Sequence, residues 1–235
     1  MVDDSKNLKD KIFAFKGLGM IGSADIIGAI ITGIFWLSIA TFLEVEEYGQ
    51  IHYFLGIAGV AYVITLFGTQ HTITVYSAKK VNVVSTLFFL SILAGVAAAL
   101  IVFIIYNEMD VSLLLIAYTI NDLSLGYLLG KKLFNNYSKY ILTQRMLTFI
   151  LGFGFYFIFG IEGIIFALAL SYIHFLILIY KGLKDSPINF SALKAHSGFI
   201  INNYVISVVG GFRGNIDKII IAPLLGFILL GNVAL

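Results

Sequence analysis

The chain has 235 residues, of which 60% are hydrophobic and only 12% are charged, and its formal net charge at pH 7 is +2. Soluble domains have about 45–50% apolar and about 25% charged residues, so fifteen basic and thirteen acidic side chains are too few to cover a water-exposed surface of this size. The absence of cysteine excludes disulfides, thiolate metal sites and redox dithiols. Composition therefore predicts a protein embedded in a membrane.

Six segments are long and apolar enough to cross a bilayer as helices. A spanning helix needs about 20 mostly apolar residues, because each residue rises about 1.5 Å through a hydrocarbon core about 30 Å thick. The first segment is longer than the apolar region of a secretory signal and further spans follow it, so we interpret it as a retained helix. The predicted spans are Gly19–Leu43, Tyr48–Phe67, Val83–Tyr106, Val111–Leu129, Met146–Phe159 with some upstream turns, and Ile161–Tyr180.

Two further segments follow the sixth predicted span. Residues 199–225 form a more polar segment, and another begins at Leu230, five residues before the last residue, Leu235. This ending leads us to expect a chain truncated within an eighth span. The fold class is therefore predicted as an all-α, polytopic transmembrane helix bundle with one complete six-helix lobe and the start of a second. We expect a cytoplasmic N-terminal tail at 1–18, the first lobe at 19–183, a cytoplasmic linker at 184–198 and the start of the second lobe at 199–235.

Charges in the connecting segments alternate along the chain. Basic residues fall in the segments at one end of the predicted spans. The segments at the opposite end carry acidic residues and no lysine or arginine. By the positive-inside rule the basic end is cytoplasmic, which predicts a multi-pass protein of the cytoplasmic membrane with a cytoplasmic N-terminus. The basic residues are Lys6, Lys9, Lys11, Lys16, Lys79, Lys80, Lys131, Lys132, Lys139, Arg145, Lys181, Lys184 and Lys194, and the opposing acids are Glu44, Glu46, Glu47, Glu108, Asp110 and Glu162.

An internal repeat relates the two ends of the chain. The motifs Ile26-Ile27-Gly28 and Gly49-Gln50-Ile51 return as Val208-Val209-Gly210 and Gly231-Asn232-Val233. The offset is constant, since 231 − 49 and 210 − 28 both equal 182. Because an even number of spans separates the copies, both leave the membrane on the same face and the repeat is parallel. The pattern predicts a six-helix unit followed by a second one.

Two stretches of the chain carry a family resemblance. The first is Ala40-Thr41-Phe42-Leu43-Glu44-Val45-Glu46-Glu47-Tyr48-Gly49, and the second is Gly214-Asn215-Ile216-Asp217-Lys218-Ile219-Ile220-Ile221-Ala222, followed by Leu225 and Leu230-Gly231-Asn232. They resemble the starts of the two halves of polysaccharide-biosynthesis membrane proteins, the O-antigen flippase family of the multidrug/oligosaccharidyl-lipid/polysaccharide exporter superfamily. The resemblance implies two six-helix lobes around a central cavity. It also implies a flippase whose substrate is a polyprenyl-pyrophosphate-linked glycan.

Polar residues inside predicted spans are candidate functional groups, because a charge at mid-bilayer costs about 2.5–3.5 kcal/mol on insertion scales. Arg213 and Asp217 lie four residues apart on one helix face, with Lys218 adjacent. Either the first two neutralise each other, or the net positive charge lines a cavity that receives the pyrophosphate of a lipid carrier. Asn121 and Asp122 fall near the middle of the fourth span. Asp122 is either a protonated structural group or the binding site of a coupling proton or sodium ion.

Asp25 lies one or two turns inside the first span, where the helix dipole favours a carboxylate, and it has either a structural or a gating role. The four histidines show no metal-ligand spacing. The chain also lacks a phosphate-binding loop, a zinc-binding helix motif and a nucleophile elbow. We therefore expect no enzyme activity, no catalytic residue, no metal or cofactor and no nucleic-acid partner.

Several functions remain open at the level of sequence. The preferred one is flipping of lipid-linked oligosaccharides by alternating access between two lobes. A cation-coupled multidrug exporter of the same superfamily would rely on Asp122 and Asp25, whereas Arg213 and Lys218 pointing into the cavity would favour an anionic lipid head group. A polysaccharide glycosyltransferase or polymerase is disfavoured because no long loop is available for catalytic residues. The last alternative is a fragment that is inert without its missing portion.

Overall fold

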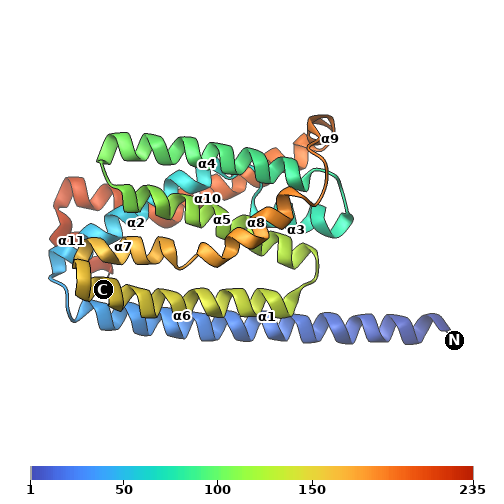
Figure 1. The fold of residues 1–235 in the computed structure, drawn as a ribbon, viewed down its shortest axis with the longest axis horizontal. Coiled ribbons are helices and arrows are strands. Elements are labelled where there is room, and N and C mark those ends of the chain that lie inside the picture. Colours follow the sequence, from blue (N-terminus) through green and yellow to red (C-terminus); the bar gives the residue numbers. More distant parts are fainter. Residues whose placement is uncertain (1, 235) are drawn as a thin grey trace.

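The computed structural model describes residues 2–234, with side chains from Lys16 onward. Over these residues the regular structure is entirely helical, which confirms the predicted all-α bundle (Figure 1). In chain order the helices are α1 (Val2–Ala40), α2 (Val45–Thr65), α3 (Gln70–Lys79), α4 (Val84–Tyr106), α5 (Met109–Gly130), α6 (Phe134–Phe159), α7 (Ile161–Leu170), η1 (Ile173–Phe175), α8 (Leu176–Leu183), α9 (Phe190–Ala195), α10 (Ser197–Leu225) and α11 (Phe227–Ala234).

Six segments of the described chain are long and apolar enough to cross a membrane, as predicted. The second differs from its prediction, because it continues beyond Phe67 through α3. The helix α1 is also continuous from Val2, so its backbone has no break between the predicted tail and the first span. The six spans are Lys16–Ala40, Val45–Lys79, Val84–Tyr106, Met109–Gly130, Phe134–Phe159 and Ile161–Leu183.

The helix α5 lies at the centre of the bundle and contacts α2, α3, α4, α6, α7 and α8. Its residues Leu114, Leu115 and Leu123 are fully buried, because apolar side chains from neighbouring helices cover both of its sides. The helices α1 and α6 pair along one side of the bundle, and α10 and α11 pack against α2 (Figure 1). The last two helices therefore attach to the six-span bundle chiefly through α2.

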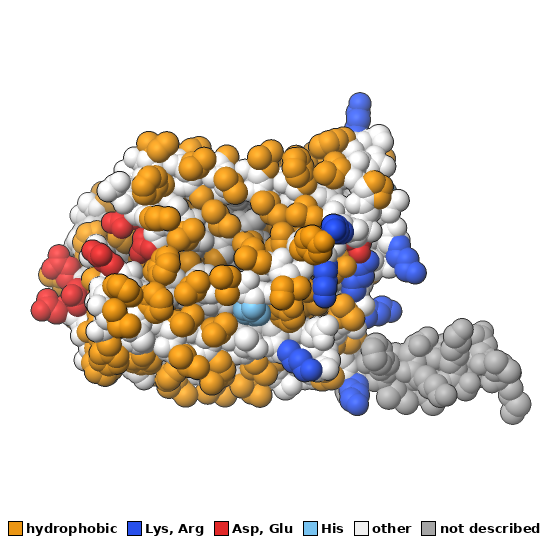
Figure 2. Space-filling view, viewed as in Figure 1, with side chains coloured by type: hydrophobic (Ala, Val, Ile, Leu, Met, Phe, Trp, Pro, Cys, Tyr) orange, Lys and Arg blue, Asp and Glu red, His pale blue; other side chains and the backbone are white. Residues whose placement is uncertain are grey.

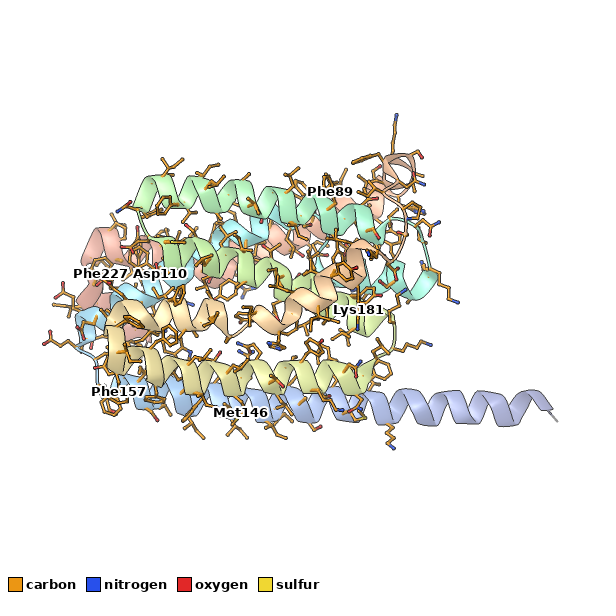
Figure 3. The ribbon with its side chains drawn as sticks, viewed as in Figure 1. Phe89, Asp110, Met146, Phe157, Lys181 and Phe227 are labelled. Atoms are coloured by element: carbon orange, nitrogen blue, oxygen red, sulfur yellow. The ribbon has the colours of Figure 1, made fainter. Side chains whose placement is uncertain are left out.

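The outer surface has an apolar middle and two charged ends. Phe89, Met146 and Phe157 lie on outer faces of the bundle with 40%, 48% and 69% of their surface exposed, as expected for side chains that contact lipid (Figure 3). Acidic side chains gather at one end, where Figure 3 places Asp110, and basic side chains gather at the other, where it places Lys181 (Figure 2). This separation agrees with the predicted alternation. The side chains of Lys6, Lys9 and Lys11 lie outside the described part of the chain.

Lys139 and Arg145 lie inside α6 and not in the connecting segment where the sequence analysis placed them. We predicted Arg145 in a connecting segment, but α6 already begins at Phe134, so Arg145 lies about 16 Å inside a spanning helix. The prediction was wrong because residues 134–140 are polar, and a hydropathy pattern assigns polar stretches to loops. In the structure α1 satisfies these polar groups: Ser138 Oγ donates to the Met20 carbonyl at 3.0 Å, and the Tyr137 hydroxyl bonds to Asp25 Oδ1 at 3.3 Å.

The helices α2 and α11 cross in backbone contact. A Cβ atom on Gly49 would collide with the carbonyl oxygen of Phe227, and one on Gly231 would collide with the carbonyl oxygen of Val45. Gly49 and Gly231 are separated by the repeat offset, and so are Val45 and Phe227. The contact of Gly49 with Phe227 is therefore equivalent to the contact of Gly231 with Val45, as expected for two repeats related by a twofold axis. This reciprocity supports the predicted parallel repeat.

Candidate functional site

The second span is a broken helix. The helix α2 ends at Thr65 and α3 begins at Gln70, so the four residues between them leave the helical path. Thr69 is the N-cap of α3, since its Oγ1 accepts the backbone N–H of Thr72 at 3.2 Å. The break lies beside Asp122, which is about 12 Å from the Gly130 end of α5. The unwound backbone therefore lies within the depth that a bilayer core would cover.

Side chains from three other helices satisfy the backbone groups that the break frees. The N–H of Gly68 donates to Ser91 Oγ on α4 at 2.9 Å. The N–H of Gln70, the first residue of α3, donates to Asp122 Oδ2 on α5 at 2.9 Å. On the other side of the break, the Tyr204 hydroxyl of α10 donates to the carbonyl of Ile64 at 2.6 Å. Buried backbone groups need such partners, so these contacts hold the break in one conformation.

A cavity of about 450 Å³ opens beside the break. It is bounded by the six-span bundle on one side and by α10 on the other, because Ser207 and Gly211 of α10 belong to its wall. Among the described residues of this wall, Asp122 is the one acidic residue and none is lysine or arginine. The lining residues are Tyr62, Val63, Leu66, Thr69, Gln70, His71, Thr74, Asp122, Leu129, Ser207 and Gly211.

The carboxylate of Asp122 has two local sources of stabilisation. It accepts a charge-assisted hydrogen bond from the Gln70 N–H, and it lies at the N-terminal end of α3, where the helix dipole favours negative charge. The residue is partly exposed, on the wall of the cavity. Asp122 can therefore meet a ligand that enters the cavity, and the neighbouring Asn121 does not line it.

A row of aromatic rings leads from the cavity into the bundle. Tyr62 of the cavity wall packs edge-on against Tyr118, with ring centroids 5.4 Å apart, and Tyr118 packs against Tyr172 at 6.0 Å. The guanidinium of Arg145 interacts electrostatically with the hydroxyls of Tyr118 and Tyr172. Its Nε is buried and has no hydrogen-bond partner among the described residues. The interior of the bundle thus contains a polar region that hydropathy did not predict.

The charged residues predicted on α10 do not line the cavity. Arg213 and Asp217 are exposed, and the described part of the chain contains one ion pair, which joins Lys131 to Asp185 instead. Lys218 is partly buried, because α10 packs it against α2 beside Gly56. In a membrane, the polar outer face of α10 cannot lie against acyl chains without a large cost.

The predicted site residues are therefore only partly brought together. Asp122 lies in the cavity, and Asp25 is exposed on α1 with its carboxylate bonded to Tyr137. The sequence analysis missed the helix break and the lining residues Gln70, Thr74 and Ser207. A signal was present, since Gly68 and the N-cap residue Thr69 directly follow the apolar run that ends at Phe67.

Comparison of the chain with protein-family models, with curated proteins and with solved structures finds no match. The function of the cavity must therefore be inferred from its own chemistry and from the sequence resemblance described above. The described wall of this chamber is of mixed polarity, with one carboxylate, one imidazole, one side-chain amide, several hydroxyl groups and a broken helix beside apolar side chains.

Proposed function

We propose that this protein is a membrane transporter that flips lipid-linked oligosaccharide precursors by alternating access. The main structural support for a transport function is the break between α2 and α3. Unwound backbone at membrane depth is tolerated where protein buries it or where it lines a water-filled cavity. Secondary transporters place their substrate sites at such discontinuous helices, near the boundary between two repeats. Here the break adjoins a cavity between the first six spans and α10, which begins the second copy of the repeat.

The substrate class follows from the resemblance of residues 40–49 and 214–222 to polysaccharide-biosynthesis membrane proteins. The hydroxyl and amide groups of Gln70, Thr74 and Ser207 suit hydrogen bonding to sugar hydroxyls. Arg213 presents a positive charge on the exposed face of α10, where it is available to the pyrophosphate of a polyprenyl carrier. The polyprenyl tail would remain in the lipid that surrounds the apolar outer surface.

A second candidate, a cation-coupled exporter of cationic compounds, is favoured by the charge of the cavity wall. Asp122 lines the cavity and no lysine or arginine does, so a cationic ligand would be attracted and an anionic one repelled. In this alternative Asp122 binds the transported cation or the coupling proton or sodium ion. The two candidates differ in which residue matters most, Arg213 for the flippase and Asp122 for the exporter.

Complementation tests the proposal. The full-length protein is expressed in a strain that lacks a lipid-linked oligosaccharide flippase, and surface glycan is measured together with the membrane level of each variant. We expect the wild type to restore glycan and Arg213→Glu to abolish restoration, while Lys80→Glu, a charge reversal at an exposed position outside the cavity, retains it. A gain in drug resistance with no restored glycan would establish the exporter instead.

A further inference from the structure

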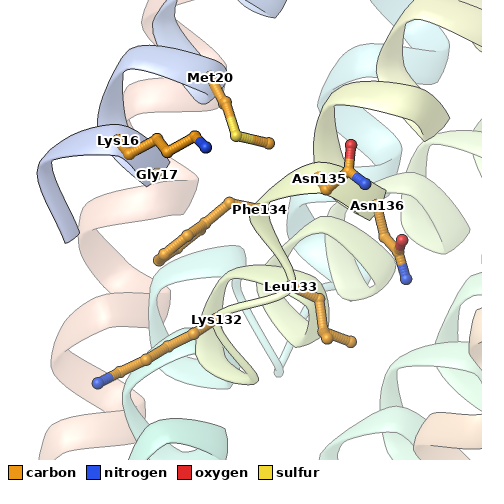
Figure 4. A pocket seen from close by; sticks show the side chains of 8 residues that line it. All are labelled: Lys16, Gly17, Met20, Lys132, Leu133, Phe134, Asn135 and Asn136. Atoms are coloured by element: carbon orange, nitrogen blue, oxygen red, sulfur yellow. The ribbon is translucent and has the colours of Figure 1, made fainter. Parts of the chain in front are cut away.

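A second cavity lies at the lysine-bearing end of the bundle, where the described side chains of α1 begin and α6 starts (Figure 4). Its volume is about 520 Å³, within the range of small-ligand sites. The cavity is separate from the one at the helix break, since the two share no lining residue. Its walls are Lys16, Gly17, Met20, Lys132, Leu133, Phe134, Asn135 and Asn136.

The cavity carries unbalanced positive charge. Among the residues whose side chains are described, its lining contains Lys16 and Lys132 and no acidic residue. The adjacent Lys131 is different, because its Nζ lies 2.6 Å from Asp185 Oδ1 and its charge is neutralised. Neither Lys16 nor Lys132 has an acidic partner among the described residues. Figure 4 shows the ring of Phe134 between the two lysine side chains. An anionic ligand would therefore meet two ammonium groups that no described acidic residue neutralises.

The backbone fixes the position of Lys132. This residue has a φ of 57°, in the left-handed region that usually holds glycine at the end of a helix. Its N–H donates to the Leu129 carbonyl at 3.0 Å, and the N–H of Leu133 donates to the Leu128 carbonyl at 2.9 Å. These two bonds close the turn between α5 and α6.

The rest of the lining matches the chemistry of a lipid at the membrane surface. Asn135 and Asn136 supply amide groups that donate and accept hydrogen bonds. Met20 and Leu133 form an apolar wall beside them, and Leu18, two residues into the first span, is 65% exposed. A ligand with a phosphate and apolar chains would therefore contact the polar groups with one part and the apolar surface with the other.

We propose that this cavity binds the phosphate head group of an anionic phospholipid from the leaflet at the lysine-bearing end. Lys16 and Lys132 contact the phosphate, and basic pockets between spanning helices are a known mode of such recognition. The asparagine amides bond to the oxygens of the head group, and the acyl chains lie along the apolar surface of α1 and α6. This site goes beyond the proposed transport function and does not depend on it.

Native mass spectrometry of the full chain in detergent tests this proposal. Retention of added phosphatidylglycerol is compared with retention of phosphatidylcholine for the wild type and for the double variant Lys16→Gln/Lys132→Gln. Because each lysine near an anionic lipid contributes about a five-fold factor, we expect a loss of about 25-fold in apparent affinity for phosphatidylglycerol and little change for phosphatidylcholine. The variant Lys16→Arg/Lys132→Arg keeps both charges and should keep most of the affinity.

The matched control is Lys80→Gln/Lys194→Gln. Lys80 also has a left-handed backbone, with a φ of 54° at the end of α3. Neither Lys80 nor Lys194 lines the cavity. An equal loss of phosphatidylglycerol in this control, or no loss in Lys16→Gln/Lys132→Gln, would overturn the proposal, because general surface charge would then explain binding. A third arm adds inorganic phosphate: if it displaces phosphatidylglycerol at millimolar concentration, the cavity binds free phosphate and the lipid assignment is wrong. Thermal unfolding without added lipid shows whether each variant is folded.

Discussion

The helix α2 has two very different surroundings along its length. Near Gly49, at the acidic end, it crosses α11 so closely that no side chain fits between the backbones. At its other end the helix unwinds after Thr65, and a cavity of about 450 Å³ opens beside the break, with Ser207 and Gly211 of α10 in its wall. The contrast indicates that the backbones of α2 and α11 touch at the acidic end, whereas toward the basic end α2 and α10 meet through side chains that enclose a cavity. Under the proposed function this is a state with the substrate chamber closed at the acidic end.

The largest effect is expected from filling the glycine crossing. Gly49→Leu places a side chain against the backbone of α11, which cannot move aside without separating the helices, so we expect destabilisation of about 3 kcal/mol or more. Thermal unfolding in detergent measures it. The control is Gly22→Leu on α1, where an added Cβ meets nothing within 4 Å. Equal unfolding temperatures for the two variants would show that the crossing is not tight.

The next largest effect is expected at the break. Asp122→Ala removes the acceptor of the Gln70 N–H, and loss of a charge-assisted hydrogen bond costs about 1.5–3 kcal/mol. Asp122→Asn keeps an oxygen acceptor and should cost less. Denaturant unfolding ranks the two variants against Asn121→Ala, whose side chain lies outside the cavity lining. If all three variants unfold alike, the Asp122 bond does not hold the break.

A smaller loss is expected on the α4 side of the break. Ser91→Ala leaves the buried N–H of Gly68 without its acceptor, at a cost of about 1–2 kcal/mol. Ser124→Ala is a closely matched control, because the Ser124 hydroxyl is also buried but has no hydrogen-bond partner among the described residues. Denaturant unfolding of both variants isolates the hydrogen bond from the loss of a small side-chain group. Equal losses of stability in the two variants would show that the Ser91 hydrogen bond does not stabilise the break.

Tyr204→Phe tests the α10 side of the break. The substitution removes the donor to the Ile64 carbonyl but keeps the ring that stacks on Phe67, with centroids 5.3 Å apart, so we expect a cost of about 0.5–1.5 kcal/mol. Tyr156→Phe removes a comparable hydroxyl bond, to the carbonyl of Phe42, at a distance from the cavity. Only Tyr204→Phe should also alter transport, which the complementation assay measures. Unchanged transport would show that α10 does not need this contact to enclose the cavity.

The smallest effect is a pH dependence at the acidic end. Partial burial, with the charges of Asp110 and Glu162 nearby, raises the pKa of Glu108 above its ordinary value of 4.5. Its neutral form is therefore favoured by folding, so this contribution to stability is complete below pH 4.5 and is lost as the pH rises through the raised pKa. Unfolding temperatures measured across that window should fall with rising pH in the wild type and fall less in Glu108→Gln. An identical pH profile for both proteins would exclude this contribution.

The spans could be predicted from the sequence because hydropathy reports length and polarity directly. The break was missed, because Gly68 and Thr69 are a weak signal and the groups that stabilise the unwound backbone come from distant helices. Asp122 was predicted as an intramembrane acid, yet its partner is a backbone N–H 52 residues away. Arg145 was misplaced because the first turns of α6 are polar and were interpreted as a loop. Their hydrogen-bond partners come from α1, which the sequence pattern does not show.

The reciprocal crossing of α2 and α11 has a mechanical consequence. Under the proposed function, a contact on the axis that relates two repeats would move least when one repeat tilts against the other, so Gly49 and Gly231 would be the pivot. The part of α2 between Gly49 and Thr65 is about 24 Å long and would tilt about this pivot. A tilt of about 10° would displace its far end by about 4 Å, enough to widen or close the chamber there while the glycines stay in place.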